Sequence, residues 1–137
     1  IMADLSITAA NVAKGTNASV TSTYLAGASI TAGQAVYQDT TDSTMKLADA
    51  DALASSAAFG VALNSAASGQ PIAVQRQGNI TIGATVVTGK AYYVSTTPGA
   101  ICLESDLSTG DFPHFLGFAT STTVIALDPK ACGVAKA

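Results

Sequence analysis

Short apolar runs rich in β-branched and aromatic residues recur along the chain, and polar turn-forming segments separate them. Four runs follow one another between residues 34 and 75: "QAVYQ", "TMKLA", "FGVAL" and "PIAVQ". Four more occupy residues 90–127: "KAYYV", "AICLE", "LGFAT" and "TVIAL". The segments between them, such as "DTTDS", "TTPGA" and "NSAASGQ", have the composition of turns. Short strands separated by turns predict an all-β protein, either a small barrel or a sandwich.

The two sets of runs are similar in sequence and in order. Gly33 aligns with Gly89, 56 residues later, and Tyr37 aligns with Tyr93 at the same spacing. Each glycine ends the turn before the first strand of its set, where a positive φ is expected. The other matching segments are residues 59–62 with 116–119 and residues 72–74 with 124–126. We therefore predict two tandem copies of a four-stranded unit, about 31–75 and 87–127, with their apolar faces packed together.

Three segments fall outside this scheme. Residues 47–59, "LADADALASSAAF", are Ala-rich with aspartates near the start, which predicts one short helix. The counterpart in the second copy, residues 104–115, contains Gly110 and a proline and can hold at most one helical turn. Between the copies, "QGNITIGATV" predicts another strand around Ile80 and Ile82.

Both ends of the chain lie outside the repeat, and we expect extended termini. In the first residues Leu5 and Ile7 alternate with polar residues, as in a half-buried strand. Such ends are often loosely held. The alternative is that the arm adds a strand to the sheet of a neighbouring subunit, with Leu5, Ile7 and Val12 as partner-binding residues. Pro129 is expected to end the last strand. The sequence divides into an N-terminal arm (1–16), a single β domain (17–128) and a C-terminal tail (129–137).

The composition favours contact with other chains. The chain has 137 residues, enough for one core, and only 11% of them are charged, against about 25% in a typical soluble domain. A surface of low charge repels neighbours weakly, although a Ser/Thr-rich β protein that stays alone has the same composition. The net charge of −3 argues against binding nucleic acid, which needs clustered Lys and Arg. The six basic residues are scattered: Lys14, Lys46, Arg76, Lys90, Lys130 and Lys136. No apolar run reaches the length of a membrane span, and no secretion signal is expected.

The residue types that carry chemistry are few. Cys102 and Cys132 have no CxxC spacing and no neighbouring histidines, so we expect reduced thiols rather than a zinc site or a disulfide. His114 is the only histidine and has no nucleophile motif beside it, so a structural or surface role is expected. No glycine-rich phosphate loop is present. We expect no catalytic residue, no metal, no cofactor and no enzymatic activity, and a small hydrolase is the remote alternative.

Acidic residues gather in the loops of both copies. We interpret them as solvated loop acids, with adventitious calcium as the alternative, because the spacing of a calcium-binding EF-hand is absent. Catalysis by a carboxylate pair is less favoured still, since the aromatic platforms that sugars need are scarce and Trp is absent. Tyr37, Tyr92 and Tyr93 are expected to pack across strands. The acids concerned are Asp39, Asp42, Asp49, Asp51, Glu104, Asp106 and Asp111.

Five segments occur in an order that is typical of one family. They are "DLSITAANVAKG", "AGASITAGQAVYQD", "KLADADA", "GVALNSAASGQPIAVQ" and "YYVSTTPGAI". In this order they resemble a family of small proteins of tailed bacteriophages, the capsid decoration or cement proteins. The resemblance covers the chain from about Ala3 to Leu127.

The resemblance implies a viral structural protein. Such proteins are β-rich modules that bind the outer face of the head, often as trimers, and stabilise it by bridging capsid subunits. We therefore expect a homotrimer on the outer surface of the virion, made in the host cytoplasm, with the major capsid protein and other copies of itself as partners. The family has no catalytic motif to transfer. The alternative is a tail or fibre component that binds host surface glycan.

Overall fold

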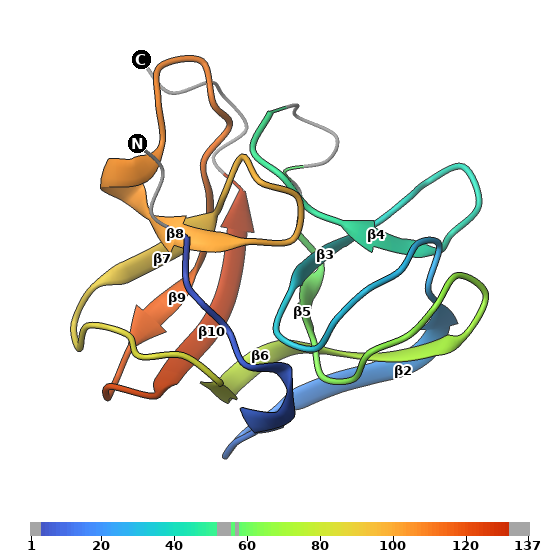
Figure 1. Ribbon diagram of the computed structural model, residues 1–137, viewed down its shortest axis with the longest axis horizontal. Coiled ribbons are helices and arrows are strands. Elements are labelled where there is room, and N and C mark those ends of the chain that lie inside the picture. Colours follow the sequence, from blue (N-terminus) through green and yellow to red (C-terminus); the bar gives the residue numbers. More distant parts are fainter. Residues whose placement is uncertain (1–3, 52–55, 57, 132–137) are drawn as a thin grey trace.

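The computed structural model describes residues 4–51, 56 and 58–131. Ten antiparallel strands form a strongly curled half-barrel (Figure 1). The order of neighbouring strands is β4-β3-β5-β6-β10-β9-β7-β8, and β1 and β2 pair with β6 outside this path. The all-β prediction is confirmed, and the architecture is a half-barrel. The strands are β1 (Val12–Lys14), β2 (Ser19–Leu25), β3 (Ala35–Gln38), β4 (Met45–Leu47), β5 (Gly60–Ala62), β6 (Pro71–Ile82), β7 (Ala91–Val94), β8 (Ile101–Leu103), β9 (His114–Ala119) and β10 (Val124–Ala131).

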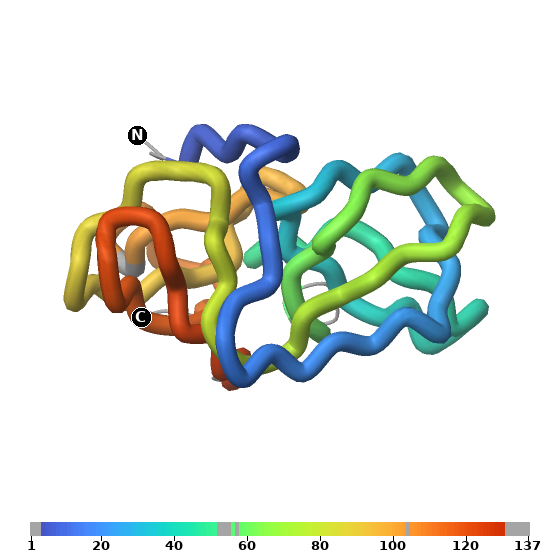
Figure 2. The backbone as a smooth tube through the Cα atoms, turned by 90° about the horizontal axis from the view of Figure 1, so that it is seen from below, coloured from blue at the N-terminus to red at the C-terminus, as the bar shows by residue number. Residues whose placement is uncertain are grey.

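Strand β6 is the central strand of the fold and pairs with four other strands. Its first part pairs with β2 and β5, and its second part pairs with β1 and β10. The bend between the parts lies at Gly78, which has φ +90° and no room for a Cβ against the backbone of Asn17. Figure 2 shows the blue segment that contains β1 and β2 running alongside β6. The strand predicted around Ile80 and Ile82 is present, but it is the second part of β6 and not a separate strand.

The strand pairing repeats in the two halves. Val36 pairs with Leu47, and 56 residues later Tyr92 pairs with Leu103. Val36 also pairs with Gly60, as Tyr92 pairs with Gly117. The two turn glycines aligned in the sequence, Gly33 and Gly89, have φ of +93° and +84°, as predicted.

The structure corrects the predicted alignment of the last strand in the two copies by one residue. Ala62 pairs with Val74, and its counterpart Ala119 pairs with Ile125. Val74 therefore corresponds to Ile125, whereas the sequence alignment matched it with Ala126. Because side chains alternate between the two faces of a strand, a slip of one residue exchanges inside and outside. Val74 and Ile125 are both buried, and Ala126 is only half-buried.

Each half contains a fifth equivalent strand. On the strand edge opposite β5, Val74 pairs with Thr21 of β2. On the strand edge opposite β9, Ile125 pairs with Ile80 of β6. The second part of β6 therefore occupies the position in its half that β2 occupies in the other. Each half therefore contains five equivalent strands, one more than the four-stranded unit predicted from the sequence.

The helix predicted for residues 47–59 is wrong over most of the part that the structure describes. Leu47 ends β4, and residues 48–51 and 58–59 contain no helix, whereas Ser56 has helical backbone; residues 52–55 and 57 lie outside the described residues. Backbone pairing with other segments competes with the helix: Ala48 N–H donates to Ala35 O, and Ala50 N–H donates to Ser95 O. The counterpart segment holds the single turn that the sequence allowed, a 3-10 turn over Glu104–Asp106. A second 3-10 turn covers Ala9–Asn11.

The core lies on the concave side of the sheet in two main clusters. The larger joins the second half to the seam between the halves and includes Ile80, Tyr92, Leu116 and Ile125. The smaller lies under the first half, around Met45 and other apolar residues. Among the described residues, no helix is long and apolar enough to cross a membrane.

Candidate functional site

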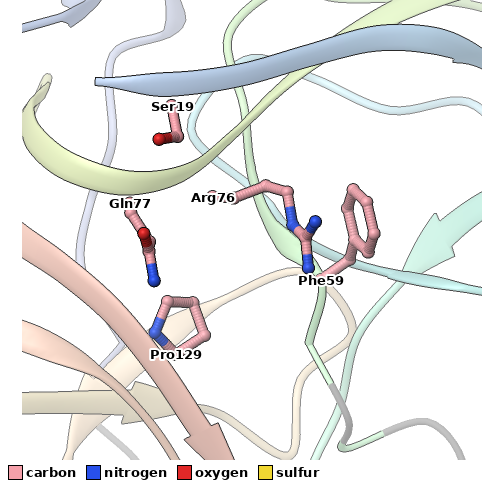
Figure 3. A pocket seen from close by; sticks show the side chains of 5 residues that line it. All are labelled: Ser19, Phe59, Arg76, Gln77 and Pro129. Atoms are coloured by element: carbon pink, nitrogen blue, oxygen red, sulfur yellow. The ribbon is translucent and has the colours of Figure 1, made fainter. Parts of the chain in front are cut away.

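A polar pocket of about 260 Å³ lies at the seam between the two halves. Its walls come from four segments: β2, the residue before β5, β6, and the far part of β10 (Figure 3). These segments are far apart in the sequence, so the pocket forms only when the chain is folded. The lining residues are Ser19, Phe59, Arg76, Gln77 and Pro129.

Among the described lining residues, Arg76 is the only one with a positive charge. Its guanidinium carbon lies 4.1 Å from the centre of the Phe59 ring, within the range of a cation–π interaction. Phe59 is itself held edge-on against Tyr24, with ring centres 5.6 Å apart. The aromatic pair therefore restricts the rotamers of an otherwise exposed arginine side chain.

The other polar groups of the pocket are neutral. Figure 3 shows Ser19 and Gln77 on opposite sides of β6, with the Gln77 amide directed toward Pro129 and the Arg76 side chain extended toward Phe59. No acidic residue is among its lining residues in the described part of the chain. Its chemistry is thus that of one fixed cation with neutral hydrogen-bonding groups nearby.

The sequence does not predict this pocket. In the sequence, Arg76 is one of six scattered basic residues. The signal that was available is that Arg76 is the only arginine of the chain. Nothing in the sequence brings residues 19, 59 and 129 to it, because their approach depends on the bend in β6 and on the course of β10.

The predicted partner-binding residues Leu5, Ile7 and Val12 lie on the chain's own core. All three are partly buried and pack against the larger cluster. Leu5 N–H donates to Ile101 O at 2.8 Å, so this segment lies beside β8. Residues 4–8 are not a regular strand; β1 begins only at Val12. A role of these residues toward a neighbouring subunit stays a prediction.

Two further contacts hold the arm to the second half. The hydroxyl of buried Ser95 donates to Oδ1 of Asp4 at 2.5 Å. Thr8 N–H donates to Gly83 O at 2.8 Å. A Cβ on Gly33 would collide with Ile7, so that glycine provides the space in which Ile7 packs. The arm is therefore an integral part of the folded chain.

The C-terminal tail begins inside β10. Pro129 was expected to end the last strand, but β10 continues to Ala131. The register of β10 against β9 shifts between Leu127 and Lys130. A proline is tolerated at such an irregularity, because its missing N–H is not needed in the ladder there. Residues 132–137, including Cys132, lie outside the described residues.

His114 and Cys102 are both buried. His114 is 4% exposed, and both of its ring nitrogens lack a hydrogen-bond partner among the described residues. Burial lowers the pKa of His114 to about 4. Cys102 is a free thiol, and burial, followed by the charge of Asp4, raises its pKa to about 12.

The acids of the first copy shape a turn. Lys46 donates to Asp39 at 2.7 Å, and Asp42 lies 3.6 Å from the same ammonium group. The hydrogen bond from Lys46 lowers the pKa of Asp39, and hydrogen bonds from Thr44 lower the pKa of Asp42. These two carboxylates thus support the β3–β4 connection, as loop acids do. In the described part of the chain no group of three or more His, Cys, Asp or Glu side chains is placed to hold a metal ion.

Comparisons with protein-family models, with curated proteins and with solved structures gave no match for this chain.

Proposed function

We propose that this protein is a bacteriophage decoration protein that binds the outer surface of a head and stabilises it by bridging capsid subunits. The observation that carries the proposal is the ordered series of five motifs along residues 3–127. The major capsid protein is the proposed partner, and a homotrimer is the proposed assembly. The structure supports the proposal through the role of the motif residues, the exposed edge of β2 and the division into two similar halves.

The motif residues hold the turns of the fold. In "GVALNSAASGQP", Asn64 Oδ1 accepts the Ala73 N–H at 2.7 Å, and Gln70 Oε1 accepts the Ala67 N–H at 2.9 Å. In "ITAGQ", Gln34 Oε1 accepts the Thr31 N–H at 2.8 Å. Motifs that specify turns are expected in a family defined by its scaffold, and a decoration protein needs a rigid scaffold rather than reactive groups.

Strand β2 offers an edge for contact with another chain. Among the named strands it pairs only with β6, and none of its residues is buried. Val20 is 40% exposed and Leu25 is 47% exposed, and the strand carries no charge. Exposed edges in proteins that stay alone are usually protected by charge, so an uncharged edge favours strand addition by a partner.

The two similar halves fit a bridging role. We propose that they are copies of one unit, each with its own outer surface, so that one molecule can touch two neighbouring subunits. Contacts of modest strength then suffice, because many linked sites raise the effective concentration at each one.

Co-sedimentation with undecorated heads of the same virus tests the proposal. We expect the wild-type protein to pellet with heads and to saturate at a fixed ratio to the capsid subunit. Val20→Lys places a charge on the β2 edge, and Val87→Lys, at a position that is 54% exposed, is the matched control. We expect weaker binding only for Val20→Lys. Absence of wild-type binding would contradict the proposal and direct attention to host glycans.

A further inference from the structure

We infer that the seam pocket around Arg76 binds a carboxylate, presented by an acidic side chain of a partner protein. The guanidinium stacks on Phe59 at 4.1 Å and is exposed at the surface. A stacked arginine has lost part of its rotamer freedom before any ligand arrives, so less entropy is lost on binding. The ring covers one face of the guanidinium, and Arg76 is in none of the ion pairs among the described residues.

The chemistry of the pocket favours a carboxylate over a phosphate. The open edge of a guanidinium offers parallel N–H donors that match the two oxygens of a planar carboxylate. The described lining residues include one cation, which balances a single negative charge, whereas a phosphate group carries nearly two. Ser19 and Gln77, which also line the pocket, are neutral and leave the charge of Arg76 uncompensated.

The acids of the described residues form no ion pair with Arg76. Asp128 precedes the pocket residue Pro129, but it lies 3.3 Å from the Lys130 ammonium. Asp39 and Asp42 are paired with Lys46. The cation is therefore available to a carboxylate from outside.

The position of the pocket suits a contact between proteins. Arginine and large aromatic residues are the side chains that most often dominate binding energy at interfaces. Here the arginine, Phe59 and the edge strand β2 lie together, since Ser19 is the first residue of β2. A partner strand beside β2 would bring its own side chains to the mouth of the pocket. That the partner is a capsid subunit rests on the proposed function; that the pocket takes a carboxylate does not.

Titration with sodium acetate at pH 7, followed by ¹⁵N NMR, tests the pocket without any partner. Because Arg76 is the only arginine, its Nε–H signal is unambiguous. We expect this signal and the Gln77 side-chain amide to shift and saturate with acetate, while sodium chloride at equal ionic strength produces no saturating shift. In Arg76→Lys, which keeps the charge but loses the planar donors, the shift of the Gln77 amide should no longer saturate. Lys90→Gln, which removes a positive charge outside the pocket, should behave as the wild type. Equal, non-saturating shifts in acetate and chloride would overturn the inference.

A second measurement separates this inference from the proposed function. Wild type, Arg76→Lys and Lys90→Gln are compared in binding to heads. Reduced binding by Arg76→Lys alone would identify the partner carboxylate as part of the capsid. Saturating acetate shifts without any binding to heads would preserve the pocket and contradict the proposed function. Equal binding of all three proteins to heads would refute the protein carboxylate as the occupant of the pocket.

Discussion

Two buried side chains keep polar atoms without hydrogen-bond partners among the described residues: Gln75 and His114. The Gln75 amide nitrogen donates to Gln77 O and Asn79 O and so spans the bend of β6, but its Oε1 accepts nothing from the described residues. An orphaned buried polar atom costs about 1–3 kcal/mol. The two hydrogen bonds from the Gln75 amide nitrogen offset this cost and hold the bend of β6. The ring nitrogens of His114 make no hydrogen bond within the described chain, so its cost is not offset in this way.

The first prediction concerns pH. The folded state keeps His114 neutral down to a pKa of about 4, while in the unfolded chain the imidazole has its ordinary pKa of 6.5. The contribution of His114 to stability is therefore fully present above about pH 6.5 and is lost as the pH falls toward 4. The loss is at most about 3 kcal/mol. Urea unfolding at pH 7 and at about pH 4.5 should show a smaller loss for His114→Phe than for the wild type. Equal losses in the two proteins would contradict this account of the histidine.

The second prediction concerns Cys102. A thiol whose pKa is raised to about 12 has almost no thiolate at about pH 8, and the buried sulfur is also out of reach of reagents. In a Cys132→Ser protein, iodoacetamide should leave the native chain unmodified for hours and should modify it rapidly in urea. Mass spectrometry reads the result, and rapid modification of the native protein would show that the thiol is accessible.

At the scale of elements, the strands follow from their composition and the exceptions follow from tertiary contacts. Apolar runs predicted eight strand positions, and the turn glycines predicted φ > 0 at Gly33 and Gly89, because these features are local. The predicted helix does not include residues 48–51, because Ala48 N–H donates to Ala35 O in β3 and Ala50 N–H donates to Ser95 O, next to β7. The strand end at Pro129 failed because β10 tolerates the proline at a shift of register.

The third prediction uses two matched glycines in the repeat. A Cβ on Gly117 would collide with the backbone oxygen of Ala126, and one on Gly60 would collide with that of Gln75. Backbone in a strand pair cannot move aside alone, so Gly117→Ala and Gly60→Ala should each lower the free energy of unfolding by about 3 kcal/mol. Gly89→Ala has open space and only the strain of a positive φ, which costs about 1 kcal/mol. Chemical denaturation measures all three, and equal costs would contradict the repeated close approach.

At the scale of the whole molecule, the arm and the seam pocket show what a sequence does not reveal. The alternation of Leu5 and Ile7 predicted that one side of the arm is buried, which is correct. It could not tell which surface buries them, and here that surface is the chain's own core. The pocket joins residues 19, 59, 76 and 129, whose approach depends on the bend of β6 and on the course of β10.

The fourth prediction follows from the arm. Ile7→Ala removes a partly buried side chain from the core and should lower the free energy of unfolding by about 1–2 kcal/mol, roughly half the cost at a fully buried site. Thr8→Ala, at an exposed neighbouring position, is the control and should change little. The effect of Ile7→Ala should not depend on protein concentration. A cost that appears only at high concentration would instead place the arm on a neighbouring subunit.

The central claim, that this protein strengthens a viral head, is tested most directly by heat. Undecorated heads are warmed with increasing amounts of the protein, and the temperature at which they disrupt is followed by light scattering. We predict that this temperature rises and then stops rising at the ratio at which binding saturates. Heads that bind the protein yet disrupt at an unchanged temperature, or heads that do not bind it, would contradict the claim.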